Sequence, residues 1–178
     1  MFSTFYLIGC ADMAPESVEE KITHVYVEEC ATLKGKQICD FVSTDEFDQE
    51  VWFHDIEGPV LLDLSAMWCA PCQAVARDIP ELHAQHPEVT FLTLLIEDGV
   101  GNPPDSNDIT GWKNSLDLDT PVWANSRELL TSNPTEVENK LYLDAWPTFY
   151  IFDENKRVVE YLRGYNKDAI NASLETLY

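Results

Sequence analysis

The sequence predicts an α/β fold, a three-layer sandwich in which helices cover both faces of a mixed central sheet. Two nearly continuous apolar runs, residues 60–66 and 89–96, predict strands that are buried on both faces. A helical pattern separates these runs, because apolar side chains recur at Val75, Ile79 and Leu82. The chain then closes with a predicted pair of strands and a helix, which indicates antiparallel as well as parallel strands in the sheet.

The N-terminal part predicts a β-hairpin ahead of these buried strands. Residues 22–28 and 37–43 are rich in β-branched and aromatic side chains, and the turn at Lys34-Gly35-Lys36 joins them. A further short strand is expected at residues 50–54. These elements would extend the sandwich at its N-terminal side.

The middle of the chain predicts one long helix and two short ones. The long helix starts at Ala70 and ends near His86, and Pro80 inside it is expected to produce a kink. Asp108 is predicted to cap a short helix that ends at Leu116. Residues 135–141 are also expected to be helical.

The C-terminal part predicts three extended segments and a last helix. Residues 121–123 form a brief extended piece, and residues 148–153 and 157–163 form two strands around a turn. Asn166 is predicted to cap the terminal helix, which runs through Leu177.

Length, composition and charge limit the classes of function that the protein can have. The 178 residues suit one domain, expected at residues 22–178 behind a leader or tether at residues 1–21. A hydrophobic content of 45% excludes global disorder. The formal net charge of −21 argues against binding to nucleic acid or to an anionic membrane surface. No apolar stretch approaches the roughly 20 residues that span a bilayer.

The first ten residues contain a candidate lipidation site. Residues 1–9 are apolar and uncharged, and Cys10 follows them. The run resembles the end of a bacterial lipoprotein signal, although it lacks a positively charged start, and cleavage would leave Cys10 as a lipid-bearing N-terminus and membrane tether. A short apolar strand or an unstructured tail is the alternative. A signal of this kind predicts the bacterial periplasm or cell envelope, with the cytoplasm as the alternative location.

Four cysteines remain if Cys10 is lipidated, and they form two pairs of close neighbours. Four cysteines allow three connectivities, and proximity favours Cys30 with Cys39 and Cys69 with Cys72. A disulfide between Cys30 and Cys39 would staple the predicted turn, and two buried thiols are the alternative. The even number, together with the export-like leader, predicts an oxidising compartment.

The segment from Trp68 to Cys72, with the sequence WCAPC, lies where a buried strand ends and a helix begins. Two cysteines separated by two residues in the first turn of a helix can close a disulfide with little rearrangement. Cys69 would face unpaired amides and the positive end of the helix dipole, which stabilise a thiolate. Such motifs commonly lower the thiol pKa from about 8.5 to about 7 or below. Cys69 is therefore the predicted reactive thiol, and Cys72 the resolving one.

Several features along the chain resemble thioredoxin-like proteins of the TlpA or redoxin branch. VLLDLSAMWCAPC at residues 60–72 is similar to their active-site strand and helix start, and AWPT at residues 145–148 is similar to their segment with a cis-proline. The lead-in at residues 40–63 resembles the N-terminal hairpin of this branch, and Gly164 after the last strand also fits. The resemblance covers residues 37–178 and implies a thioredoxin-like sandwich with an N-terminal hairpin extension.

The resemblance assigns catalytic roles to three residues. It makes Cys69 the attacking thiol and Cys72 the resolver, and it gives Asp63 the place of a buried acid that exchanges a proton with the resolving cysteine. The apolar neighbours of Asp63 should raise its pKa toward the range useful for a general base. A strand-end residue that reaches solvent is the alternative for Asp63.

The resemblance also implies a substrate groove around the dithiol. The backbone of Trp146 would pair with an extended substrate beside a cis Pro147, and a trans proline that merely starts a strand is the alternative. The implied substrate-binding residues are Trp68, Ala70, Pro71, Trp146, Pro147 and Thr148.

The expected protein is a monomeric thiol-disulfide oxidoreductase that needs no cofactor or metal. It would reduce protein disulfides in the envelope through a mixed disulfide and would be recharged by an upstream redox partner. One alternative is a non-catalytic thioredoxin-like binding module whose Cys69–Cys72 bond is structural. The other is a zinc-binding domain that adds His83 and His86, which is disfavoured because Cys72 and His83 would lie roughly 16 Å apart along one helix. Both histidines are expected on the solvent side of that helix.

Overall fold

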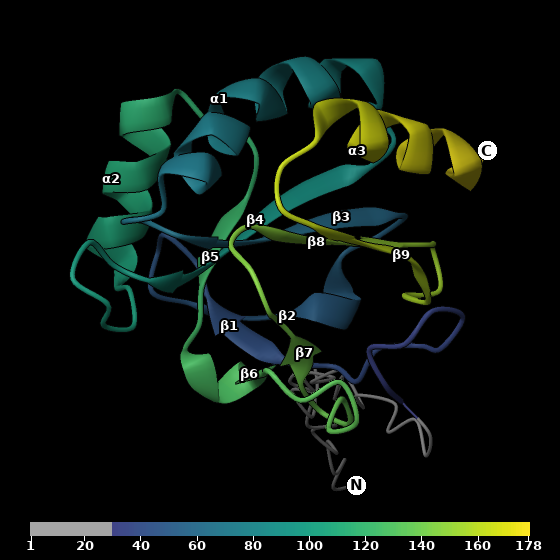
Figure 1. Cartoon of the computed structure of the whole chain (residues 1–178). Coiled ribbons are helices and arrows are strands. Elements are labelled where there is room, and N and C mark those ends of the chain that lie inside the picture. Colours follow the sequence, from purple (N-terminus) through teal and green to yellow (C-terminus); the bar gives the residue numbers. More distant parts are fainter. Residues whose placement is uncertain (1–29) are drawn as a thin grey trace, which may run out of the picture.

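The computed structural model describes residues 30–178 and confirms the predicted fold class, a mixed sheet with helices packed on it (Figure 1). The predicted leader or tether at residues 1–21, which includes Cys10, lies outside the described residues, and so does the predicted strand at residues 22–28. No helix in the described part of the chain is long and apolar enough to cross a bilayer.

Seven strands form the main sheet in the order β2-β1-β5-β4-β3-β8-β9. Strands β3, β4 and β5 are parallel and form its centre, whereas β1, β2, β8 and β9 pair antiparallel at its two sides. A separate two-stranded sheet joins β6 and β7. The bounds are β1 Val42–Thr44, β2 Glu50–Trp52, β3 Val60–Ala66, β4 Thr90–Glu97, β5 Val122–Ala124, β6 Leu130–Thr131, β7 Leu141–Tyr142, β8 Thr148–Phe152 and β9 Val158–Arg163.

All three α-helices pack on one face of the main sheet. They are α1 Ala70–Gln85, α2 Ser106–Leu116 and α3 Lys167–Leu174, and Figure 1 shows α1 and α3 lying together above the strands. Side chains alternate along a strand, so Leu61 of β3 and Phe91 of β4 point toward this layer. They form one buried cluster with Val75 of α1, Trp112 of α2 and Ile170 of α3.

The opposite face is covered by a short 3-10 helix and by irregular segments. Helix η1, Phe53–Asp55, buries Phe53 completely against this face. The Phe53 ring stacks on Phe41 with centroids 4.8 Å apart and meets Phe152 of β8 edge to face at 5.0 Å. The helices on the two faces are therefore of different kinds, α-helices on one and a 3-10 helix on the other.

The prediction of one strand over residues 37–43 is wrong. Gln37 makes only an isolated bridge with Arg157, and β1 begins at Val42. Ile38 and Phe41 are both buried in the same cluster, although three positions separate them. An uninterrupted strand would point them to opposite faces, so the chain must bend between them. Similarly, the end of the predicted strand at residues 50–54 belongs to η1.

The predicted helix at residues 135–141 is also wrong. Val137 and Leu141 are both buried four positions apart, which imitates one face of a helix. The segment instead follows a turn and enters β7, and the Thr32 hydroxyl donates to the Val137 carbonyl at 3.2 Å and to the Lys140 carbonyl. Hydrogen bonds to a distant residue thus replace those of a local helix.

The cap of one helix differs from the prediction. The N-cap of α2 is Asp105, whose side chain accepts from the amides of Asn107 and Asp108, and Asp108 returns a bond to the Asp105 amide. Asp108 is therefore the third residue of a capping box and not the cap. Helix α1 continues through Pro80 to Gln85. As predicted, the Asn166 side chain caps α3.

Candidate active site at the start of the first helix

The dithiol lies at the junction of the central strand and α1. Strand β3 ends at Ala66, a short turn follows, and α1 begins at Ala70 with Cys69 as its N-cap residue. The Cys69 backbone is extended, with φ −82° and ψ 108°, and Pro71 lies in the first helical turn. Pro71 suits this place because the first amides of a helix have no intrahelical acceptor.

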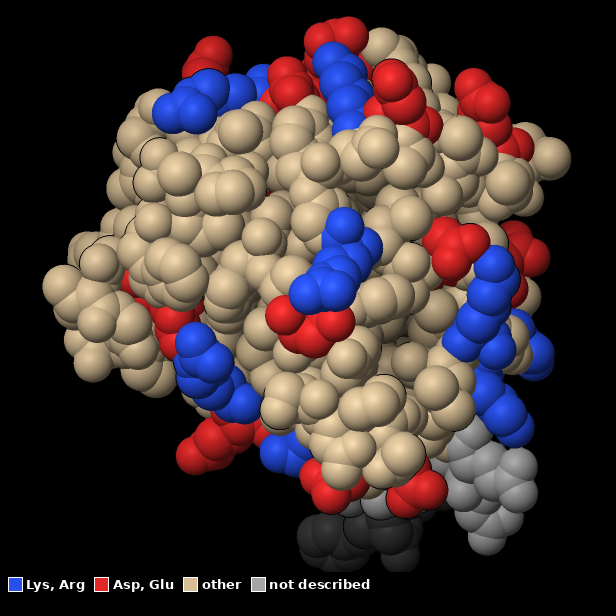
Figure 2. All heavy atoms as spheres, in the orientation of Figure 1, with Lys and Arg blue, Asp and Glu red and all other residues tan. Residues whose placement is uncertain are grey.

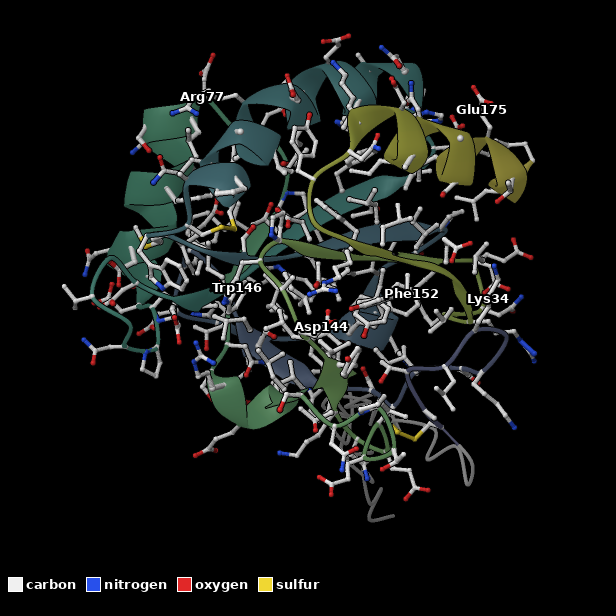
Figure 3. All side chains as sticks on the ribbon, in the orientation of Figure 1. Lys34, Arg77, Asp144, Trp146, Phe152 and Glu175 are labelled. Atoms are coloured by element: carbon white, nitrogen blue, oxygen red, sulfur yellow. A yellow bond between two sulfur atoms is a disulfide. The ribbon has the colours of Figure 1, made fainter. Side chains whose placement is uncertain are left out.

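Cys69 and Cys72 form a disulfide, with their Cα atoms 5.2 Å apart. The disulfide lies beneath the start of α1, and Trp146 is close to it (Figure 3). Cys72 is completely buried, and only 3% of the Cys69 surface is exposed. The Cys72 amide donates to Cys69 Sγ at 3.2 Å, and the first turn of α1 contains no acidic side chain. After reduction, Cys69 Sγ would face these helix donors, which favour the thiolate.

Asp63 of β3 is completely buried, so the alternative position in solvent is wrong. The Ser65 hydroxyl donates to Asp63 Oδ2 at 2.8 Å, and Oδ1 has no hydrogen-bond partner among residues 30–178. Burial raises the pKa of Asp63 to about 7, and the bond from Ser65 offsets only part of this rise. A carboxyl group with this pKa can accept and return a proton near neutral pH.

The segment before β8 forms the second side of the site. The peptide bond between Trp146 and Pro147 is cis. The Thr148 hydroxyl donates to the Ala145 carbonyl at 2.8 Å, and the Gly164 amide donates to the Pro147 carbonyl at 2.9 Å. By contrast, no group in the described part of the chain forms a hydrogen bond with the Trp146 backbone.

Glu97 and Arg127 also belong to the site, and the sequence analysis did not identify them. The rings of Trp68 and Trp146 meet edge to face, with centroids 6.2 Å apart. Trp68 Nε1 donates to Glu97 Oε2 at 2.7 Å, and Arg127 Nε donates to Glu97 Oε1. The guanidinium carbon of Arg127 lies 5.9 Å from the centroid of the Trp146 ring.

Glu97 left a signal in the sequence, whereas Arg127 did not. Glu97 ends β4, which runs parallel to β3, and it lies opposite Ala66 in the register. The carboxyl ends of neighbouring parallel strands share one edge of the sheet, so an acid near the dithiol could have been predicted at this position. Arg127 lies in the 3-10 helix η2, Arg127–Leu129, and no local pattern indicates its long-range contacts.

The surface around the dithiol is mostly uncharged. Figure 2 shows few Lys, Arg, Asp or Glu side chains directly over the start of α1, although oppositely charged side chains meet in the middle of the same view. Trp68 is 48% exposed there, and Ala70 and Pro71 are exposed beside it. Such a surface suits contact with an apolar or uncharged peptide segment better than with a strongly charged one.

The other predicted cysteine pair lies far from this site (Figure 3). Cys30 and Cys39 form a disulfide with their Cα atoms 4.8 Å apart. The loop between them lies along the outer strand β9, where Lys34 bridges Val158. The disulfide therefore closes this loop, and the backbone bridge at Lys34 joins the loop to the edge of the sheet.

The two histidines of the zinc alternative do not join the dithiol. The His83 ring lies 5.5 Å from the ring of Phe91. His86 is buried, with Nε2 3.0 Å from Asn171 Oδ1 of α3, so its predicted solvent-side position is wrong. The reason is that His86 caps the end of α1, where the chain turns back toward the core. Among residues 30–178, no group of three or more His, Cys, Asp and Glu side chains could hold a metal ion.

Comparison with known proteins finds a family model that matches part of the chain and a relative that matches most of it. The family model named Thioredoxin matches residues 39–100. Thioredoxin H4-2 of Oryza sativa subsp. japonica is 22% identical over 170 residues, which are 95% of this chain and 96% of that relative.

Solved structures show the same fold. The exposed lipoprotein thioredoxin of Streptococcus pneumoniae strain TIGR4 is 25% identical with a TM-score of 0.60, over 78% of this chain and 100% of its own. A DsbF homologue from Corynebacterium diphtheriae is 14% identical with a TM-score of 0.62, over 80% of this chain and 87% of its own. The architecture around the dithiol is therefore thioredoxin-like.

Proposed function

We propose that this chain, whose fold is thioredoxin-like, is a thiol-disulfide oxidoreductase acting on protein disulfides through Cys69 and Cys72. One observation carries the proposal: the sulfur of Cys69 caps a helix, is bonded to Cys72, and belongs to the strand-to-helix unit that also buries Asp63. A merely structural disulfide would need neither a helix-end sulfur nor a buried acid.

In the proposed reducing reaction, the Cys69 thiolate attacks one sulfur of a substrate disulfide. A bond forms between these sulfurs, and the other substrate sulfur leaves as a thiolate. The Asp63 carboxylate accepts the proton of the Cys72 thiol. The resulting Cys72 thiolate attacks Cys69 Sγ, re-forms the intramolecular disulfide and expels the second substrate thiolate. The protein has then lost two electrons to the substrate, and an upstream dithiol donor must restore them.

The substrate would lie extended along the segment before β8. The backbone amide and carbonyl of Trp146 have no hydrogen-bond partner among residues 30–178, which supports this arrangement, because an extended peptide can bond to both as an added strand. Trp68, Ala70 and Pro71 would contact it from the α1 side, and Pro147 and Thr148 from the β8 side. Bonds from the substrate would then hold its sulfur near Cys69 during the attack.

Turnover of a defined substrate tests this function. The wild-type protein should catalyse the reduction of insulin disulfides by dithiothreitol, and Cys69→Ser should abolish catalysis. In the absence of dithiothreitol, reduced Cys72→Ser should accumulate a mixed disulfide with insulin, because the attacking thiol remains and the resolving thiol is absent. A double Cys30→Ser/Cys39→Ser variant is the matched control and should retain turnover. No turnover, combined with slow alkylation of reduced Cys69 at neutral pH, would favour the non-catalytic binding module.

The reducing direction and the envelope location belong to the same proposal. A reduction potential near roughly −270 mV for the Cys69–Cys72 pair would support a reductant, whereas one near roughly −120 mV would indicate an oxidant. The likeness to an exposed lipoprotein thioredoxin supports export. If Cys10 carries a lipid, the protein made in a bacterial host should incorporate a labelled fatty acid, and Cys10→Ser should not.

A further inference from the structure

Glu97, at the end of β4, connects the turn that precedes the dithiol with Trp68 and Trp146, which form the aromatic rim of the site. Its side chain is only 6% exposed, and each carboxylate oxygen has a different partner. Oε2 accepts the bond from Trp68 Nε1, and Oε1 accepts from Arg127 Nε. The Glu97 carbonyl also accepts from the Met67 amide at 2.9 Å. Glu97 is therefore fixed relative to the turn that precedes Cys69.

Arg127 links Glu97 to the second tryptophan, Trp146. Its guanidinium packs on the ring of Trp146, which in turn meets the ring of Trp68 edge to face. The four side chains thus form a closed ring of contacts, although they come from the turn after β3, the end of β4, η2 and the segment before β8. Neither tryptophan can rotate away without losing a contact to this ring.

The charge of Glu97 suits this arrangement. The hydrogen bond from Arg127 is the main cause that holds the pKa of Glu97 below its usual range, against the effect of its burial. The Arg127 side chain itself remains 61% exposed, so it also faces solvent beside the two tryptophans. An exposed ion pair alone contributes little, but a buried partner and an aromatic neighbour both strengthen it.

We propose that Glu97 and Arg127 are positioning residues that hold Trp68 and Trp146 together as one aromatic surface, against which a bulky apolar residue beside the substrate cysteine packs. This inference rests on the proposed function, since it names the substrate class of the same site. Two preorganised tryptophan rings offer a large apolar contact surface at a low cost in side-chain entropy. The preference concerns binding and leaves the exchange between sulfurs unchanged.

Kinetics with matched peptides test the inference. The probes are two short peptides with a disulfide-bonded cysteine, one with Leu and one with Ser next to it. Arg127→Gln should raise KM for the Leu peptide roughly fivefold to tenfold, with kcat unchanged, and alter KM for the Ser peptide less than twofold. Glu97→Gln should do the same, and the double variant should be no worse than either single one, because both break one unit.

Lys113→Gln is the matched control. It also removes one positive charge from an ion pair, with Glu46, but contacts neither tryptophan in the structure. Equal KM values for Arg127→Gln and Lys113→Gln would overturn the inference, and so would an equal loss on both peptides. The near-ultraviolet circular dichroism of Arg127→Gln should also change, because the tryptophan pair loosens, while its unfolding temperature should remain near that of Lys113→Gln. A wild-type protein inactive on both peptides would refute the proposed function itself, a result distinct from these.

Discussion

Asp63 combines complete burial with a single hydrogen bond from Ser65, and this combination determines its expected behaviour. Because its pKa is raised to about 7, Asp63 changes from acid to carboxylate across the neutral range. Only the carboxylate can accept the proton of Cys72. In the wild-type protein, resolution of the mixed disulfide should therefore accelerate as pH rises through 7.

Asp63→Asn should move this acceleration to higher pH, where the Cys72 thiol ionises without the carboxylate, and should slow resolution at pH 7 by roughly a hundredfold. Rapid-quench measurement of the mixed disulfide between pH 5.5 and 9 checks this. The attack step serves as the control, since Asp63→Asn in a Cys72→Ser background should form the mixed disulfide at an unchanged rate. A variant whose resolution keeps the wild-type pH profile would exclude Asp63 as the proton acceptor.

The same burial should make Asp63 a source of instability at high pH. An acid whose pKa is raised by folding binds its proton more tightly in the folded state, so stability falls as pH rises from about 4 to above 7. At pH 8 the ionised Asp63 costs up to roughly 4 kcal/mol. The free-energy difference between Asp63→Asn and wild type should therefore grow in favour of the variant between pH 4.5 and pH 8. Urea unfolding of the oxidised proteins measures it, and a constant difference would contradict the assignment.

At the scale of the element, the start of α1 is expected to control the reactivity of Cys69. The first turn contains no acidic residue, and Ala70 is exposed there. Ala70→Glu would place a negative charge beside the sulfur and oppose its thiolate, so alkylation by iodoacetamide at pH 7 should slow by roughly twofold to fivefold. The control is Ala84→Glu near the other end of the same helix, which is also exposed and should leave the rate unchanged. Equal rates for both variants would mean that the helix start does not activate the thiol.

The elements that could be predicted from the sequence are those with a strong local pattern. Strands β3 and β4 are continuous apolar runs, and α1 repeats its apolar residues at helical spacing, so each lies close to its predicted position. Residues 135–141 also place buried apolar side chains, Val137 and Leu141, at helical spacing. This segment is not helical, however, and the Thr32 hydroxyl holds it by hydrogen bonds to its backbone carbonyls. A pattern of burial alone cannot distinguish these two cases.

The residues of the site also differ in whether a local sequence pattern could predict them. Cys69, Cys72 and Asp63 lie within ten residues on one strand-to-helix unit, so their local arrangement follows from the sequence. Arg127 is brought to Trp146 by the path of the chain after β5, which has no sequence signature. The dithiol could therefore be predicted, whereas the residues that hold its aromatic rim required the structure.

At the scale of the whole molecule, the net charge of −21 must be accommodated on the surface. Figure 2 shows several of the Lys and Arg side chains of this face lying next to acidic ones, among a larger number of acidic groups near the rim. The pairs Lys34–Glu160 and Lys167–Glu81 lie at the surface, where water screens them, so each contributes little to stability and little is lost when salt is added. Repulsion among the unpaired carboxylates is the larger effect.

Salt should therefore stabilise this protein. At pH 7, raising sodium chloride from about 10 mM to about 500 mM shortens the screening length from roughly 30 Å to below 5 Å and should raise Tm by roughly 3–8 °C. Calorimetry of the oxidised protein measures the change. Sodium chloride and sodium perchlorate at the same low ionic strength, about 100 mM, should give similar increases, because screening depends on charge and not on ion identity. A Tm that falls with salt would mean that the exposed ion pairs outweigh the repulsion, and the surface would then contribute stability that its composition does not predict.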